Sequence, residues 1–258
     1  MKTWLRNVWG GRNVIKVMTL AGMKAEYSHT LFGFLWLLLK PALMVAAIVA
    51  TFYFRAGDIE LASYALTVAY GVVIWNVMSS IINQMSGLIY SQKQTFLKTT
   101  LPREVISLIP VARTGVDFIF GFVFILLAHI FLLQMPSVFS LFVLVSATIL
   151  GALVSYGAGL IMAILSVYFR DLKYLVSYMM RILFFITPIF LLELPVGILT
   201  KTLYFNPFSL AITMGRAGEY AHSNLEGVIF ALVLWAGSFL TVGVWFFGKK
   251  VYDVVDIV

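Results

Sequence analysis

The sequence has no cysteine and very little charge. Only 11% of its 258 residues are Asp, Glu, Lys or Arg, whereas 62% are hydrophobic. A soluble domain of this length carries roughly 25% charged residues. Without cysteine the chain has no disulfide, no thiolate metal site and no cysteine nucleophile. The low charge excludes an ordinary water-soluble surface, so we expect lipid to surround most of the chain.

Motifs for nucleotide binding and hydrolysis are also missing. The sequence contains no G-x-x-x-x-G-K-[ST], no H-E-x-x-H and no G-x-S-x-G pattern. Its three histidines, His29, His129 and His222, lie far apart along the chain. We therefore expect no catalytic residues, no metal site and no cofactor bound to this chain. His129 is expected to be a packed residue rather than a proton carrier.

Long apolar segments take the place of these motifs. A helix that crosses a membrane needs about 20 mostly apolar residues. Six segments meet this requirement, at residues 31–54, 61–90, 105–133, 139–169, 174–194 and 227–247. The sequence thus predicts an all-α membrane protein, with six transmembrane helices in a domain over residues 31–258.

The stretch from about 188 to 220, between the fifth and sixth spans, has a different pattern. Its charge-free runs at 182–192 and 202–215 are too short to be full spans. Pro188, Pro195 and Pro207 disfavour a straight helix because each lacks a backbone donor. We expect short re-entrant helices here, at the outer mouth of a cavity.

The basic residues indicate the orientation of the spans. With the N-terminus inside, twelve Lys and Arg side chains lie in cytoplasmic segments and three in outer segments. Such a bias is typical of positive-inside topology. It predicts that both termini are cytoplasmic, and it accounts for the net charge of +7 without a nucleic-acid partner.

Residues 1–30 are predicted to form a separate amphipathic helix at the cytoplasmic membrane surface. Apolar residues recur there at helical spacing between basic residues, which is typical of a helix lying in the headgroup region. The apolar positions are Trp4, Leu5, Val8 and Trp9, and further on Val14, Val17, Met18 and Met23.

The predicted spans contain charged residues, where charge is costly and suggests function; among them are Lys40, Arg113, Asp117 and Arg181. Arg113 and Asp117 are four residues apart on one helix, so we expect them to pair with each other, with a role in transport as the alternative. Lys40 and Arg181 have no evident partner in the sequence. Each either extends toward the cytoplasmic headgroups or lines a polar cavity between subunits.

Four short patterns, in this order, resemble a known family. They are Lys24-x-x-Tyr27 with Leu31, Gly33, Leu35-Trp36 and Pro41; Leu88-Ile89-Tyr90 with Leu97-Lys98 and Leu101-Pro102-Arg103-Glu104; Phe169-Arg170-Asp171-Leu172; and Thr187-Pro188 with Asn206-Pro207. Together they resemble the membrane subunit of ABC transporters that export O-antigen, capsular polysaccharide or teichoic acid. The resemblance covers nearly the whole chain.

The resemblance implies partners and site residues. A second copy of the chain would complete a channel, and two separate nucleotide-binding subunits would hold ATP and Mg²⁺. It places ATPase-coupling loops at Lys93, Lys98, Arg103, Glu104, Arg170 and Asp171, and an outer gate at Pro188, Pro195, Asn206 and Pro207. Candidates for channel lining or substrate contact are Phe32, Trp36, Lys40, Arg113, Arg181, Phe184 and Phe185, since sugar faces stack on aromatic rings.

One position departs from the family pattern. A basic residue usually precedes the tyrosine of the first motif, and this chain has Glu26 there. The departure weakens the expectation that this position contacts an anionic lipid head. Lys40, directly before Pro41, is a candidate to compensate.

The functional hypothesis is a permease that moves lipid-linked polysaccharide, O-antigen above all, out across the inner membrane. A drug or lipid exporter built on the same kind of subunit is the first alternative. A secondary carrier without an ATPase is the second, although such a carrier would need more buried carboxylates than Asp117. A membrane-embedded transferase would need paired polar catalytic residues, which the sequence does not offer.

Overall fold

The computed structural model describes residues 2–53, 60–98, 101–132, 134–190, 205–218 and 224–255. Throughout these ranges the regular elements are helices, which confirms the all-α fold. Five described helical segments are long and apolar enough to cross a membrane: Gly33–Phe52, Leu61–Ser86, Arg103–Phe131, Val138–Tyr168 and Leu225–Val254. They coincide with the first, second, third, fourth and sixth predicted spans.

The predicted fifth span is only partly represented by a helix. Helix α9, Leu172–Ile186, has 15 residues, and Pro188 follows shortly after its end. This length is less than the roughly 20 residues of a full span. Residues 191–204, which hold Pro195 and the end of the predicted span, lie outside the described residues. The count of six spans therefore stays a prediction.

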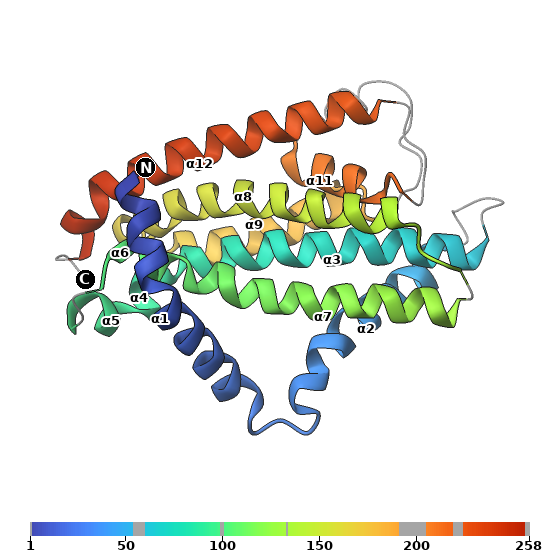
Figure 1. Cartoon of the computed structure of the whole chain (residues 1–258), viewed down its shortest axis with the longest axis horizontal. Helices are drawn as coiled ribbons and strands as arrows, with labels where there is room; N and C mark the ends of the chain where they lie inside the picture. The colour runs from blue at the N-terminus through green and yellow to red at the C-terminus, as the bar shows by residue number, and fades with distance from the viewer. Residues whose placement is uncertain are drawn as a thin grey trace.

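The N-terminal helices, up to residue 52, form a V beside the helical bundle (Figure 1). One arm is α1, Lys2–Tyr27, and the other is α2, Trp36–Phe52, which follows the short 3-10 helix η1, Gly33–Leu35. Gly33 has φ +51° in the turn at the apex, a conformation that only glycine adopts readily. The predicted N-terminal helix is thus present. Trp9 and Val17 on it are 72% and 65% exposed.

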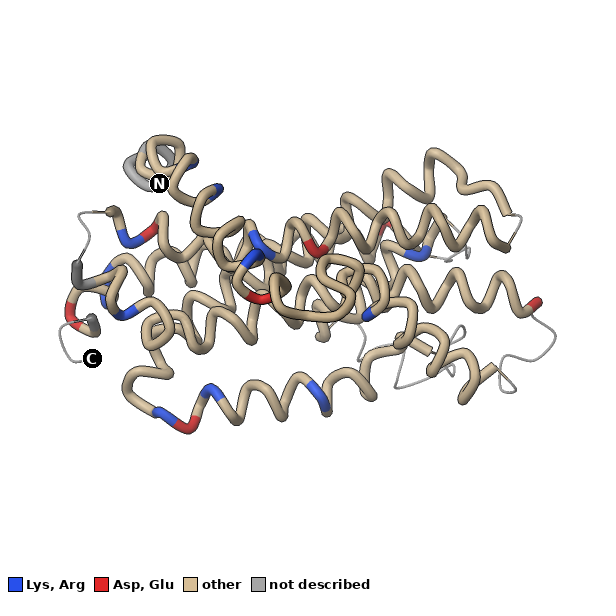
Figure 2. The backbone as a smooth tube through the Cα atoms, turned by 90° about the horizontal axis from the view of Figure 1, so that it is seen from below, with Lys and Arg blue, Asp and Glu red and all other residues tan. Residues whose placement is uncertain are grey.

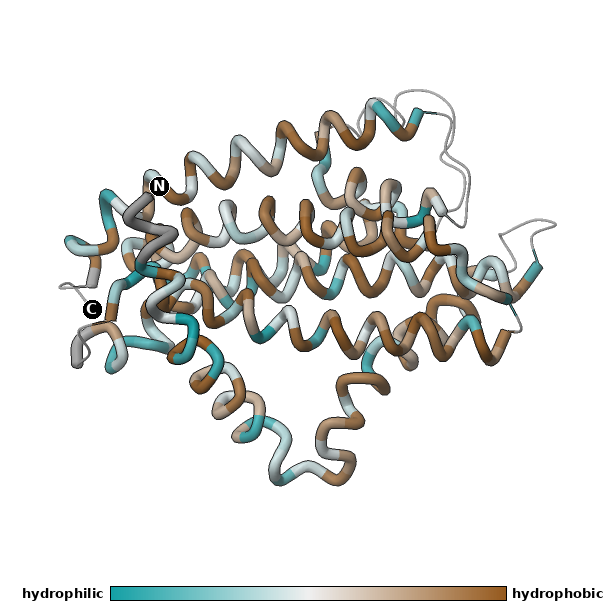
Figure 3. Tube along the Cα trace, in the orientation of Figure 1, coloured by the Kyte–Doolittle hydropathy of each residue, from teal (hydrophilic) through white to brown (hydrophobic). Residues whose placement is uncertain are grey.

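Helix α3, Leu61–Ser86, is the centre of the bundle. It packs against α2, α7 (Ile109–Phe131), α8 (Val138–Tyr168), α9 and α11 (Pro207–Arg216), while α12 (Leu225–Val255) lies along α8 and α11. Apolar residues cover most of the length of these helices (Figure 3). Because α3 touches so many neighbours, its polar residues lie inside the protein rather than toward lipid.

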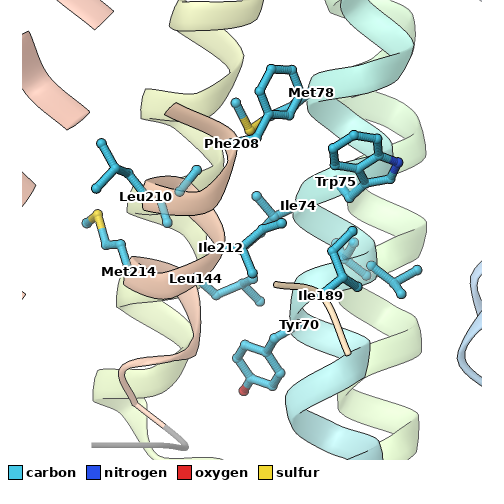
Figure 4. Packing of buried hydrophobic residues seen from close by; sticks show 14 of the residues in the cluster. Tyr70, Ile74, Trp75, Met78, Leu144, Ile189, Phe208, Leu210, Ile212 and Met214 are labelled. Carbon is cyan, nitrogen blue, oxygen red and sulfur yellow. The ribbon is translucent and has the colours of Figure 1, made fainter. Parts of the chain in front are cut away.

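The short helix α11 packs against α3, α8 and α12 in the main core. Asn206 caps it by accepting a hydrogen bond from the Phe208 backbone N at 3.0 Å, and Pro207 occupies its first turn. Phe208 and Ile212 then pack toward Tyr70, Ile74, Trp75 and Met78 of α3 (Figure 4). The Asn206-Pro207 pattern therefore starts a buried short helix.

The loops predicted to be cytoplasmic gather at one end of the bundle. Both termini lie at this end with the short helices α4 (Leu88–Ser91), α5 (Lys93–Lys98) and α6 (Arg103–Ser107) (Figure 1). The turn at Arg170 and Asp171 joins them, since the Tyr90 hydroxyl donates to the Val167 carbonyl at 3.4 Å. Basic residues mark this end in Figure 2. Such clustering is consistent with the predicted topology.

Gly11 lets α1 rest against α6 at this end. A Cβ added at Gly11 would lie 2.5 Å from Val105 Cγ2, whereas one added at Gly10 meets nothing within 4 Å. We expect Gly11→Ala to destabilise the packing of α1 by about 1–3 kcal/mol through steric overlap. Gly10→Ala should stabilise α1 by up to about 1 kcal/mol through helix propensity.

Limited proteolysis of α1 in the purified full-length chain measures this difference. Faster cleavage of Gly11→Ala than of the native chain is expected, with Gly10→Ala cleaved no faster. Equal cleavage of the two variants would mean that α1 does not rest on α6 through this glycine.

Candidate functional site

Five uncharged polar side chains lie on α3 between positions 76 and 84, and we call them the polar face of α3. They are Asn76, Ser79, Ser80, Asn83 and Gln84. Each lines at least one of three cavities around this helix. They were not predicted from the sequence, because the prediction rested on charged residues within the spans. Their helical spacing, at i, i+4 and i+8 for Asn76, Ser80 and Gln84, was the available signal.

The first cavity, of about 370 Å³, lies between the arms of the V and the helices α3 and α7. Glu26 of α1, Lys40 of α2, and Arg113 and Asp117 of α7 all line it. Arg113 forms an ion pair with Glu26, and Lys40 Nζ lies 3.9 Å from the same carboxylate. Cations from α2 and α7 thus lie at one carboxylate on α1.

The expected pairing of Arg113 with Asp117 is wrong. Among the described residues, the ion pair of Arg113 is with Glu26 on another helix. Lys40 also has partners, because its Nζ donates to the Tyr27 hydroxyl at 3.1 Å and lies over the Tyr27 ring. Glu26, the position that departs from the family pattern, is therefore the carboxylate that neutralises both cations.

The cavity between α3 and α9 brings together three of the predicted channel residues. Arg181, Phe184 and Phe185 line it, and its volume is about 460 Å³. Ser177 donates to Asn83 Oδ1 at 3.2 Å across its wall. Amide, hydroxyl and guanidinium groups next to ring faces can bind sugar hydroxyls and stack on sugar rings.

The ring of Phe184 is anchored against the core beside this cavity. Its centroid lies 5.4 Å from that of Trp75 and 5.4 Å from that of Phe185, both in edge-on geometry. Arg181 Cζ lies 5.3 Å from the Tyr178 ring centroid on the exposed face of α9. Four side chains form a row along the exposed face of α9, which we call the α9 row: Tyr174, Tyr178, Arg181 and Phe185.

Phe32 and Trp36 occupy a different place. They contact each other edge-on at 5.6 Å near the apex of the V, and they do not line the three cavities described here. Phe32 is 51% exposed. The structure therefore separates these two candidates from Arg181, Phe184 and Phe185.

The predicted coupling residues differ in how they are engaged. Arg103 Nη1 donates to the Val251 carbonyl at 2.7 Å and its guanidinium lies 4.1 Å from the Tyr252 ring centroid. Arg103 thus connects the start of α6 to the end of α12. Arg170 and Asp171 are exposed, Lys93 lies on α5, and the side chain of Lys98 is outside the described part.

Arg216 on α11 is a buried cation that the sequence analysis placed in an outer segment. It donates to the backbone carbonyls of Thr67, Pro188 and Ile189. Its side chain therefore joins the end of α11 to α3 and to the segment after α9, which contains the predicted gate residue Pro188. Its position at the end of the charge-free run 202–215 was the one available signal.

No family model matches this sequence. Two Klebsiella pneumoniae proteins named O-antigen export system permease protein RfbA are 26% and 25% identical to it, each over 95% of both chains. A Myxococcus xanthus protein of the same name is 23% identical over 91% of this chain and 93% of its own. The resemblance predicted from the four motifs is therefore confirmed: along nearly its whole length, this chain is similar to the permease subunits of O-antigen export systems.

Proposed function

We propose that this chain is the transmembrane subunit of an ATP-driven exporter that moves a lipid-linked polysaccharide of the O-antigen type out across the inner membrane. The observation that carries the proposal is the similarity to three O-antigen export permeases over at least 91% of the chain. The five apolar helices supply a membrane domain of the required kind.

The remaining parts of the proposal follow from this assignment. Two copies of the chain enclose a channel, each with six spans and both termini in the cytoplasm. A separate nucleotide-binding subunit, with ATP and Mg²⁺, docks at the end formed by α4, α5, α6 and the turn at Arg170 and Asp171. The outer gate lies at Pro188, Pro195, Asn206 and Pro207, together with α11.

The α9 row is the proposed contact surface for the polymer. Tyr178 is 61% exposed and Phe185 is 67% exposed, so both rings are available to a second copy or to a substrate. Ring faces hold sugars by stacking without fixed hydrogen bonds, which lets a polymer slide. The cavity of about 460 Å³ beside α9 adds hydrogen-bonding groups along the same path.

The test uses the full-length chain purified with its ATPase subunit in lipid vesicles. Lipid-linked polysaccharide should stimulate ATP hydrolysis, and Tyr178→Ala should reduce the stimulation several-fold. Phe230→Ala is the matched control, because Phe230 is a 67% exposed ring on α12 outside the α9 row. Stimulation by drugs instead of polysaccharide would favour the alternative exporter. Failure to co-purify any ATPase subunit would favour a secondary carrier.

A further inference from the structure

A third cavity, of about 320 Å³, lies where α1, α3, α4, α7 and the first turn of α9 meet. Its described lining includes two cations, Arg113 and Lys173, and contains no carboxylate. Thr19, Gln84, Ser91 and Gln92 add hydroxyl and amide groups to the wall. The first cavity differs, because Glu26 and Asp117 balance its cations. The cavity beside α9 also has no carboxylate in its lining, but it has a single cation, Arg181. The third cavity, with two cations, therefore has the lining that favours an anion most among the three described here.

Thr19 gives independent support for a ligand at this place. Its side chain is 5% exposed, and its hydroxyl has no hydrogen-bond partner within the described residues. Threonine in a helix usually bonds to the carbonyl one turn before it. A buried hydroxyl without a partner is unfavourable. A ligand oxygen in the cavity would satisfy the donor that the protein leaves unused.

Lys173 is placed to reach the cavity because Gly87 has no side chain. A Cβ added at Gly87 would lie 3.2 Å from Lys173 Cε, so the lysine stem passes close over the junction of α3 and α4. Gln84 Nε2 donates to Thr114 Oγ1 at 3.3 Å, which positions the amide in the wall. The two cations thus reach the cavity from α7 and α9, two separate helices.

We propose that this cavity binds a phosphate or diphosphate group, with Arg113 and Lys173 as the cations and the Thr19 hydroxyl as a donor. Phosphate oxygens accept short, charge-assisted hydrogen bonds, and a guanidinium can bind two of them at once. Glu26 already pairs with Arg113, so a doubly charged group competes better than a singly charged one. The affinity for phosphate stands on the cavity alone. That the group is the head of the exported lipid rests on the proposed function.

Inorganic pyrophosphate is the probe for the site, with the full-length chain in detergent and calorimetry as the readout. Lys173→Gln should weaken pyrophosphate binding at least tenfold. Thr19→Val, which removes the hydroxyl and keeps the shape, should weaken it several-fold while leaving the unfolding temperature without ligand unchanged or higher. Lys249→Gln is the control, because Lys249 is an exposed cation on α12 beside Trp245. The Lys249→Gln variant should bind pyrophosphate as tightly as the native chain does.

The possible results test the phosphate site and the proposed export function separately. Equal binding by Lys173→Gln and the native chain, or no binding by the native chain, would overturn the site. Vesicles with a polyprenyl diphosphate should displace pyrophosphate if the group is a lipid head. Binding of pyrophosphate without such displacement supports a site for the free anion and overturns the link to the exported lipid. If the protein binds pyrophosphate but polysaccharide does not stimulate ATP hydrolysis, the result contradicts the proposed function and supports the phosphate site.

Discussion

Gly157→Ala and Gly243→Ala are each expected to destabilise the fold by about 3 kcal/mol, because α8 and α12 cross with their backbones in contact there. A Cβ added at Gly157 would lie 2.6 Å from the Leu240 backbone N, and one at Gly243 would lie 2.9 Å from Gly157 Cα. Backbone atoms cannot move aside as a flexible side chain can. Small residues are what allow membrane helices to approach this closely.

The unfolding temperature of the purified chain in detergent measures this effect. Gly237→Ala is the matched control on α12, since a Cβ there meets nothing within 4 Å. The control should keep or slightly raise the unfolding temperature. A loss at Gly237 as large as at Gly157 would contradict the predicted crossing of α8 and α12.

Arg216→Met is the second substitution with a large expected effect. It keeps most of the side-chain volume but removes the donors to the carbonyls of Thr67, Pro188 and Ile189. Arg216 is 7% exposed, so water does not readily replace those donors. Each buried acceptor left without a donor costs about 1–3 kcal/mol. With three such acceptors, we expect a total loss of about 3 kcal/mol or more, concentrated where α11 meets the segment after α9.

Two further variants separate the hydrogen bonds from the positive charge. Arg216→Lys should recover only part of the stability, because an ammonium group lacks the planar fork of donors. Gly71→Ala should act in the same direction as Arg216→Met, since a Cβ at Gly71 would lie 2.5 Å from Arg216 Nη2. Arg12→Met, at an exposed site on α1, is the control.

Because the chain has no native cysteine, a label reacts only with a cysteine that is introduced, and the labelling rate reports on the structure around that position. A single cysteine at Phe205, a position that is 79% exposed, reports on the segment just before α11. Faster labelling there in Arg216→Met than in the Arg12→Met control would support a local role for Arg216. Unchanged labelling and an unchanged unfolding temperature would show that Arg216 does not hold this region.

The spans could be predicted from the sequence because a membrane helix needs only a sufficient length of apolar residues. Helices α3, α7, α8 and α12 therefore follow the predicted apolar runs closely. The chain between residues 182 and 220 could not be assigned in the same way. Within its described parts, residues 182–190 and 205–218, the packing depends on contacts such as that of Arg216 with Thr67, which joins residues 149 positions apart.

The candidate site was harder to predict because it depends on distances between helices. Spacing along α7 favoured a pair between Arg113 and Asp117, but the fold brings Glu26 of α1 to Arg113. Arg181, Phe184 and Phe185, three of the predicted channel residues, line one cavity beside α9. Their role in the channel stays a prediction. Phe32 and Trp36 lie elsewhere because the turn at Gly33 directs them to the apex of the V.

The most direct test of the proposed export function is transport by the reconstituted complex. Vesicles that contain this chain, its ATPase subunit and a radiolabelled lipid-linked polysaccharide should move the polymer across the membrane only when ATP is present on the side of the ATPase. Under the proposed export function, vesicles that contain this chain alone transport no polymer. Transport of the polymer by the chain without any ATPase would contradict it.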